Sequence, residues 1–322
     1  MNKQYAIRFL AWTAVLLILP FVIKNPYLMH LAIMSIIFAI MAQGLNLILG
    51  YAGNLSLGQA ALYAIGGYAF TLLVKNLSFN FWISVLLAIM ITAFIGYLVG
   101  LISLRVRGAA FIIMTISFSS IVHLVLLNWV GLTNGQMGIA NIPSPAIGGF
   151  VIDSKMSFYF LVLVFLIFVQ FISGRLIHSK VGRAFIAVKD DELLASSVGI
   201  SSYRYSLFAF VLGASCAGLS GSLYASYAQF ISPEMSSFTL IMLPLLMMTV
   251  LGGRQTLWGP VLGAFIFTIL PEYLRLAEDL RLPIFGFLLI LMVLFIPDGL
   301  LPAFNRAFLK FSKNETVKEV AK

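Results

Sequence analysis

The chain has 322 residues, of which 61% are hydrophobic and only 10% are charged. A soluble domain is closer to half apolar and a quarter charged, so this composition excludes an ordinary cytosolic enzyme and a disordered chain. The formal net charge of +9 does not indicate a nucleic-acid partner, because the basic residues lie between long apolar runs. Cys216 is the only cysteine, which excludes an intrachain disulfide and any multi-cysteine metal site.

Ten apolar segments approach the roughly 20 residues that a membrane-spanning helix needs. We therefore expect an all-α polytopic membrane protein with about ten transmembrane helices. The first segment contains Pro20 and is interpreted as a retained helix, since no clear small-residue cleavage site precedes Lys24. The ninth is short and is expected to tilt or to re-enter the membrane. The segments are 9–23, 28–49, 58–74, 81–104, 109–130, 157–177, 206–230, 237–252, 257–271 and 283–297.

The distribution of basic residues orients these spans. With a cytoplasmic N-terminus and strict alternation, 15 of the 20 Lys and Arg residues fall inside and 5 fall outside. The positive-inside rule then predicts that both termini are cytoplasmic. The long inside loop is about 174–205, and the Gly-, Pro- and Asn-rich outside loop, about 131–156, should form ordered turns. We interpret residues 1–304 as one transmembrane domain and 305–322 as a basic cytoplasmic tail.

The uncharged segment Gly50–Gln59 separates the second and third spans. Irregular backbone at membrane depth is tolerated only where it packs against protein or lines a cavity, and we expect a buried turn of this kind. Ser56 is a candidate cap for a helix that begins near Gly58, whose N–H groups would carry positive partial charge. The alternative is a turn that only packs, with Gln59 bonded to a neighbouring helix.

Two Gly-x-x-x-Gly pairs are expected to let helices approach closely inside the bundle. His30 is expected at a solvated membrane edge. His123 is deeper in its span and is expected to be hydrogen-bonded within the bundle. The glycine pairs are Gly96/Gly100 and Gly259/Gly263.

The sequence lacks the residues that several kinds of chemistry require. The chain has no G-x-x-x-x-G-K-[ST] motif, so it has no P-loop for ATP. No span contains paired carboxylates, which weighs against a proton-driven carrier. Gly218–Gly221 matches the G-x-S-G pattern of rhomboid-type intramembrane proteases. However, all three histidines precede Ser220, whereas the rhomboid base follows its serine, so we interpret this stretch as a packing face.

The inside loop contains the clearest helix-capping signals in the chain. Asp190 is a favourable N-cap, and Asp191 and Glu192 place negative charge in the first turn. Gly199 suits the position just after a helix, where a left-handed conformation is common. These residues predict a helix of about two turns between Asp190 and Gly199.

Leu194 and Val198 lie at i and i+4 and share one face of this predicted helix. A helix this short is not stable alone, so it needs a partner in the same chain or in another protein. Membrane-interface helices prefer Lys and Arg around their polar face. The acidic start therefore favours a protein partner.

This loop resembles the coupling loop of ABC-importer permeases, and in particular the M-type permeases of high-affinity branched-chain amino-acid uptake, in which a G-R-A…D-E…A…G-[IL] pattern is typical. Stretches 45–60, 217–234, and 250–253 with 297–302 match the same family in order. Glu192 and Gly199 are seven residues apart, one more than in the general coupling motif but as in the M-type form. The resemblance implies ATPase-coupling roles for Gly182, Arg183, Asp190, Asp191, Glu192, Leu194, Val198 and Gly199.

The resemblance also implies a heteromeric importer in a bacterial inner membrane. This chain would pair with an H-type permease, two cytoplasmic subunits that hold ATP and Mg, and an extracytoplasmic substrate-binding protein. It would bind no cofactor or metal itself and no nucleic acid. Urea, a short amide or another small solute is the alternative cargo of the same machine. A stand-alone carrier or channel is the alternative from another class.

A zwitterionic, apolar solute needs apolar walls with a few neutral polar groups. The uncharged turn between the second and third spans supplies such groups, and its glycines allow the backbone to come close to a solute. We therefore predict that this turn lines the translocation path or its gate. The predicted path residues are Gly53, Asn54, Ser56, Gly58 and Gln59.

Overall fold

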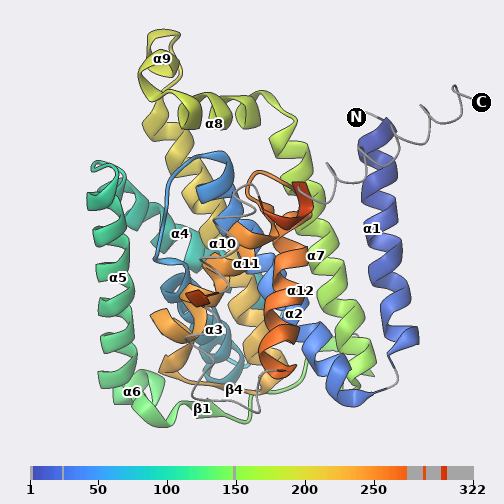
Figure 1. The fold of residues 1–322 in the computed structure, drawn as a ribbon. Coiled ribbons are helices and arrows are strands. Elements are labelled where there is room, and N and C mark those ends of the chain that lie inside the picture. Colours follow the sequence, from blue (N-terminus) through green and yellow to red (C-terminus); the bar gives the residue numbers. More distant parts are fainter. Residues whose placement is uncertain (1–2, 24, 148–149, 274–285, 288–298, 303–322) are drawn as a thin grey trace, which may run out of the picture.

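The computed structural model describes residues 3–23, 25–147, 150–273, 286–287 and 299–302. The α-helices are α1 Lys3–Val22, α2 Pro26–Leu45, α3 Gln59–Asn76, α4 Phe81–Ser103, α5 Ala109–Asn128, α6 Val130–Thr133, α7 Lys155–Ile177, α8 Lys180–Asp190, α9 Glu192–Ser197, α10 Ser202–Ala228, α11 Leu243–Gly253 and α12 Gly259–Tyr273. The π-helical turns are η1 Asn46–Tyr51 and η4 Phe238–Met242, and the 3-10 turns are η2 Gly135–Met137 and η3 Pro233–Ser236. The longer helices run between two ends of the molecule (Figure 1). One end carries α8, α9 and the start of α1, and the other carries α6.

The helices follow the apolar segments expected from the sequence, and the protein is a mostly helical, multi-pass membrane protein. Within the described residues, five spans are long and apolar enough to cross a membrane, namely α2 continued by η1, α4, α5, α7 and α10. Shorter apolar stretches lie in α1, in η4–α11 and in α12. The tenth expected span, 283–297, lies outside the described residues except for 286–287, and the tail 305–322 lies wholly outside them. The count of ten and the sides of the termini therefore remain predictions.

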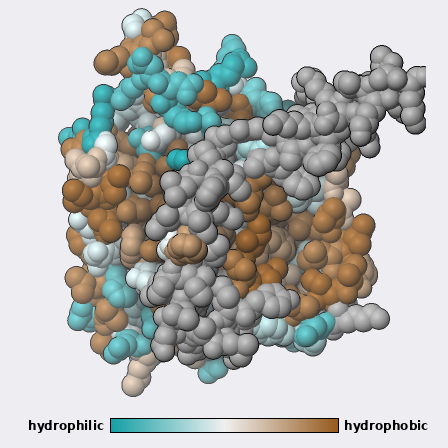
Figure 2. All heavy atoms as spheres, in the orientation of Figure 1, coloured by the Kyte–Doolittle hydropathy of each residue, from teal (hydrophilic) through white to brown (hydrophobic). Residues whose placement is uncertain are grey.

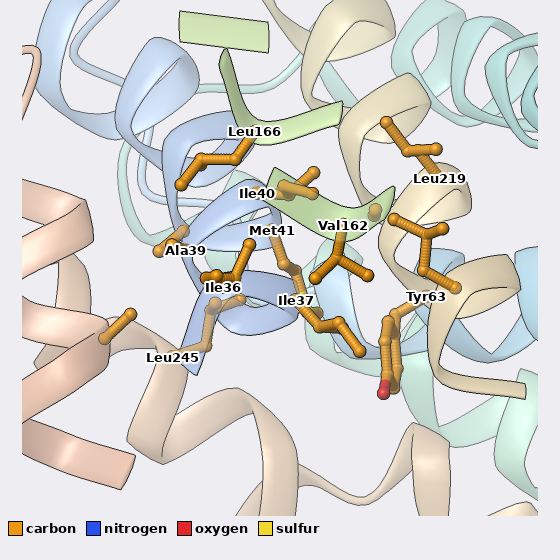
Figure 3. Close-up of a cluster of buried hydrophobic side chains, with 14 of the residues drawn as sticks. Ile36, Ile37, Ala39, Ile40, Met41, Tyr63, Val162, Leu166, Leu219 and Leu245 are labelled. Carbon is orange, nitrogen blue, oxygen red and sulfur yellow. The ribbon is translucent and has the colours of Figure 1, made fainter. Parts of the chain in front are cut away.

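The core is built around α2. In the most apolar 18-residue stretch of α2 and η1, 89% of the residues are buried. The corresponding stretches of α4 and α5 are 28% and 22% buried. Figure 3 shows Ile37 and Met41 of α2 facing Val162 of α7, with Leu219 of α10 and Leu245 of α11 close by. α4 and α5 are therefore peripheral helices whose outer faces remain apolar. In Figure 2 many of the coloured residues at mid-height, on the left and on the right of the view, are hydrophobic.

Small residues allow the closest helix contacts, as the glycine pairs predict. A Cβ added to Gly96 of α4 would meet Ala214 of α10, and one added to Gly263 of α12 would meet the Met248 carbonyl of α11. Ser220 of the protease-like pattern donates its hydroxyl hydrogen bond to the Ile37 carbonyl oxygen at 2.7 Å. Gly221 lies against the Tyr63 carbonyl. This stretch is a packing face.

The end that carries α6 is made of short ordered turns, as expected for 131–156. Strand β1 (Ile139–Ala140) pairs with β4 (Phe230–Ile231), and β2 (Ala146–Ile147) pairs with β3 (Phe150–Val151), both antiparallel. Lys75 donates to the Ala140 carbonyl at 2.8 Å. These pairings connect the α3, α5–α7 and α10 regions of the chain.

Of the two histidines singled out in spans, His123 has its expected environment. Its Nδ1 lies 2.8 Å from the Ser236 hydroxyl and 3.1 Å from the Pro233 carbonyl oxygen, within the bundle. His30 lies near the start of α2, is half-buried and lines a pocket that also contains charged and polar residues. Its Nδ1 lies 2.8 Å from the Tyr227 hydroxyl of α10, and the two rings are stacked. The position of His30 at a solvated membrane edge stays a prediction, and its contact with α10 is one that the local sequence does not reveal.

Candidate functional site

Helix α8 turns the chain away from α7 and lies across one end of the molecule (Figure 1). The Ser179 hydroxyl accepts hydrogen bonds from the Val181 and Gly182 N–H groups and caps this helix. A side chain at Gly182 would overlap the carbonyl oxygens of Leu176 and Ile177, so glycine is required for the sharp turn. Phe185 is fully buried and anchors α8 on η1 and α10.

The capping of α9 differs from the expectation by one residue. Asp190 ends α8, and Asp191 is the N-cap, accepting from the N–H groups of Leu193 and Leu194 at 2.9 and 3.0 Å. The expectation failed because α8 continues to Asp190, and only Asp191 takes the extended backbone of a cap. Gly199 occupies the predicted position with φ +83°.

The C-terminus of α9 closes with a Schellman motif. The Ile200 N–H donates to the Ala195 carbonyl at 2.9 Å, and the Gly199 N–H donates to the Ser196 carbonyl at 3.0 Å. Ala195 is the buried residue that faces the rest of the molecule. A helix of six residues is thus capped at both ends and kept at one tip of the protein.

Helix α9 presents apolar side chains to its surroundings. Leu193, Leu194 and Val198 are 79%, 64% and 71% exposed. Figure 2 shows this hydrophobic tip above a largely hydrophilic belt. Exposed apolar groups gathered on one small element indicate a contact surface for another molecule.

The segment between η1 and α3 is an irregular turn, as its composition predicts, and it is exposed at Gly53 and buried at its α3 end. The Leu57 N–H donates to the Thr115 hydroxyl of α5 at 3.1 Å, and Ser56, Gly58 and Gln59 are buried. The cap assignment needs correction. Gly58 is the N-cap residue of α3, and Ser56 accepts the Gly58 N–H at 3.3 Å, one position before the helical N–H groups that it was expected to cap.

Gln59 begins α3 with a buried side chain whose amide nitrogen and oxygen have no hydrogen-bond partner among the described residues. The alternative expectation, a bond from Gln59 to a neighbouring helix, is therefore not met in this part of the chain. A buried amide without a partner costs about 1 to 3 kcal/mol. Gln43 of α2 and Gln170 of α7 have the same property, which the sequence analysis did not anticipate.

A polar pocket of about 490 Å³ joins the two predicted sites. Gly53 and Asn54 contribute from the turn, and Lys189 and Glu192 contribute from α8 and α9. The other predicted site residues do not line it. Its full lining is Ala52, Gly53, Asn54, Leu104, Arg105, Val106, Arg107, Gly108, Val188, Lys189, Glu192, Ser202, Tyr203 and Ser206.

Three contacts hold the pocket walls together. Arg107 Nη2 lies 2.7 Å from Glu192 Oε1, which ties the α4–α5 loop to α9. Asn54 Nδ2 donates to the Ser206 hydroxyl of α10 at 2.9 Å. Gly53, with φ +76°, lies against Lys189, so a Cβ there would come within 2.8 Å of Lys189 Cγ. These contacts connect α8 and α9 to the turn.

Two residues of η1 that attach it to the α11–α12 loop were not predicted from the sequence. Asn46 Nδ2 donates to the Thr256 carbonyl at 2.9 Å, and its Oδ1 accepts the Gln255 N–H at 3.2 Å. The Tyr51 hydroxyl donates to the Gln255 carbonyl at 2.9 Å. The amide of Asn46, within the largely apolar segment 28–49, was the available signal for this role.

Among the residues that the structure describes, no three His, Cys, Asp or Glu side chains group together to hold a metal. The described residues do bring together an exposed apolar tip at α9, the Arg107–Glu192 ion pair and the contact between Lys189 and Gly53.

Comparison with known proteins supplies the biological context of this arrangement. The model of the family "Branched-chain amino acid transport system / permease component" matches residues 27–296. The high-affinity branched-chain amino acid transport system permease protein LivM of Salmonella typhimurium is 32% identical over 90% of this chain and 73% of its own length. LivH of the same organism is 26% identical, over 82% of this chain and 91% of its own length. A probable LivM of Methanocaldococcus jannaschii is 24% identical over about two thirds of each chain. No solved structure matches.

Proposed function

The chain belongs to the family of permease components of branched-chain amino acid transport systems, and on that premise we propose that it is the M-type permease subunit of an ABC importer. It moves branched-chain and other hydrophobic amino acids across a bacterial inner membrane. An H-type permease pairs with it, two cytoplasmic subunits hydrolyse ATP with Mg, and an extracytoplasmic protein delivers the solute. The chain itself catalyses no reaction.

The exposed apolar tip of α9 is the observation that carries this proposal. Its three large side chains face away from the chain, while Ala195 alone packs inward. The acidic groups at its start favour a partner with basic or amide groups around an apolar cleft. We assign this partner as the ATPase subunit, so the α8–α9 end is cytoplasmic.

Conformational change then passes from α9 to the path in two steps. Closure of the ATPase subunits shifts α9, and the Arg107–Glu192 pair and the Lys189–Gly53 contact transmit the shift. The turn from Ala52 to Gly58 follows and carries Gln59 at the start of α3. The Gln59 amide, which has no partner in the part of the chain that the structure describes, offers a donor and an acceptor to the passing solute, and this supports a path or gate role for the turn.

ATPase capture tests the docking assignment. We expect Leu194→Asp to reduce copurification of the ATPase subunits with the intact permease complex, because a carboxylate would have to be desolvated in the cleft. Met137→Asp is the matched control, since Met137 is 82% exposed and lies near α6, at the opposite end. Equal capture by both variants and the native complex would refute docking through α9.

Cysteine labelling tests the orientation. In a Cys216→Ser background, Arg183→Cys should react with an impermeant reagent only from the cytoplasm and Asn141→Cys only from outside. Both residues are exposed, and they lie near opposite ends of the bundle. Labelling of both from one side would overturn the alternating topology and the assignment of α9 with it.

A further inference from the structure

The polar pocket beside α9 carries an excess of positive charge. Three of its lining residues are cations, Arg105, Arg107 and Lys189, and Glu192 is the only carboxylate among them. In the described part of the chain Arg107 has the one ion pair, with Glu192. The pocket therefore favours an anion over a cation or a neutral solute.

The N-terminus of α10 adds hydrogen-bond donors to the same wall. Ser202 and Tyr203, the first residues of this 27-residue helix, line the pocket. The N-cap residue Ser201 makes no side-chain capping bond. The first N–H groups of a helix lack intrahelical partners and carry positive partial charge, which suits an anion.

Ser202 is an independent sign of a ligand. Its side chain is only 7% exposed, and its hydroxyl oxygen has no hydrogen-bond partner among the described residues. Because Ser202 lines a cationic pocket and its buried hydroxyl has no partner in the described part of the chain, this hydroxyl is available to donate to a bound group. Ser206, one turn further along α10, lines the same pocket and is already bonded to Asn54.

We infer that this pocket binds a small solute through a carboxylate or phosphate group, held by Arg105, Arg107, Lys189, Ser202 and the α10 N-terminus. The volume of about 490 Å³ is ample for a single small anion. Lys189 and Arg105 are exposed and able to turn toward the ligand.

Binding has a consequence for α9. The side chain of Arg107 is 70% exposed, so its pair with Glu192 is screened by solvent and is readily exchanged. An anion in the pocket competes with Glu192 for Arg107 and so loosens α9 from the α4–α5 loop. On the proposed function, such an anion acts from the cytoplasm and weakens the connection between the ATPase subunits and the path.

The binding test uses the purified full-length permease, alone, in phosphatidylcholine nanodiscs. Calorimetric titration with sodium phosphate and with sodium acetate, at constant ionic strength set by sodium chloride, should detect saturable binding of at least one of them. Nanodiscs that contain phosphatidylglycerol form a third arm. If a lipid headgroup is the natural source, the anionic headgroup of phosphatidylglycerol should compete for the pocket. The affinity for phosphate should then be lower in nanodiscs that contain phosphatidylglycerol than in nanodiscs of phosphatidylcholine alone.

Variants connect the binding to the pocket. We expect Ser202→Ala to raise the dissociation constant about tenfold, because it removes a buried hydrogen bond to a charged group. Arg105→Gln should raise it about threefold to fivefold, as expected for an exposed charge. Arg204→Gln is the matched control, since Arg204 is an exposed cation on the same helix turn that does not line the pocket.

A spin label on Leu193→Cys, in the Cys216→Ser background, reports the release of α9. Its mobility should increase with phosphate or acetate in the native pocket and should stay constant in Ser202→Ala at the same concentration. Absence of saturable binding in all three arms would overturn the inference, and so would equal losses in Ser202→Ala and Arg204→Gln. These measurements need no ATPase subunit, so they fail or succeed independently of the importer assignment.

Discussion

Helix α9 and the turn from Ala52 to Gly58 are both short segments between longer helices, but their surfaces are opposite. α9 exposes large apolar side chains at the tip of the molecule, whereas the turn and the start of α3 bury polar groups inside it. Each arrangement is unfavourable for an isolated chain. The proposed function accounts for both surfaces in the same way, because each is completed by another molecule, a protein at α9 and a solute at the turn.

Charge reversal at the connection between the two segments should have the largest effect. Glu192→Lys places a cation opposite Arg107 and removes the acid at the start of α9. We expect uptake per mole of folded permease to fall about tenfold or more. Coupling free energies between sites typically correspond to changes of about 5-fold to 150-fold. Membrane insertion should be unchanged, because Glu192 is at the surface.

The matched double variant Arg107→Glu with Glu192→Lys restores a pair of opposite charges at the same place. It should recover a substantial part of the lost uptake. Full uptake by Glu192→Lys alone would show that α9 and the turn are not connected through this pair.

Added bulk inside the turn is expected to have the next largest effect. At Gly58 a Cβ would lie 3.3 Å from the Thr115 carbonyl oxygen and 3.4 Å from the Phe118 ring, so the branches of valine have no room. Gly58→Val should lower uptake per mole of folded, ATPase-associated permease about fivefold or more, the effect of roughly 1 kcal/mol on a barrier.

Gly131→Val is the control for Gly58→Val, because nothing lies within 4 Å of a Cβ at that position. A constant ratio of uptake to folded protein across native, Gly58→Val and Gly131→Val chains would leave the turn as a packing element only.

The contact between Gly53 and Lys189 can be separated from backbone strain by a pair of variants. Gly53→Ala and Gly108→Ala both place a side chain at positive φ, where an L-residue is strained. Only Gly53→Ala also meets Lys189, while a Cβ at Gly108 has nothing within 4 Å. We expect both variants to lower the melting temperature, but uptake per mole of folded permease should fall, by about threefold, only in Gly53→Ala. Equal uptake would remove this contact from the coupling route.

The smallest expected change in uptake comes from replacing a buried glutamine, and it should differ between two glutamines. Gln59→Leu and Gln170→Leu each remove a side chain without partners in the described residues. Both should leave stability unchanged or raise it by about 1 kcal/mol. Only Gln59→Leu should reduce uptake, by about twofold to threefold, with binding-protein affinity unchanged. A loss of stability in Gln59→Leu would show that its amide is satisfied within the assembled protein.

Local sequence signals predicted the apolar helices and the C-terminal end of α9 but not the contacts between distant segments. The apolar runs predicted most span boundaries within a few residues, and Gly199 was placed correctly because its left-handed backbone is a local property. Asp190 was misplaced because helix α8, which was not predicted from the sequence, packs through Phe185 and continues to Asp190.

The pocket could not be predicted for a different reason. Arg107 and Glu192 are far apart in the sequence and carry no periodic relation, and the same is true of Asn54 and Ser206. The two residues of each pair come into contact only because of the way α4, α8 and α10 pack. That packing cannot be inferred from the polar residues of separate loops. The lack of partners at Gln59 likewise depends on which groups the folded bundle brings near it.

The attachment of Asn46 to the α11–α12 loop has a consequence for biosynthesis. Its carbonyl and N–H partners come 210 and 209 residues later in the chain. At about 5 to 20 residues per second, the ribosome needs roughly 10 to 40 s to make them. During that time the second span holds an amide whose final partners do not yet exist. A nascent chain stalled before residue 255 should therefore remain near the insertion machinery, and release should follow once the α11–α12 loop has been made.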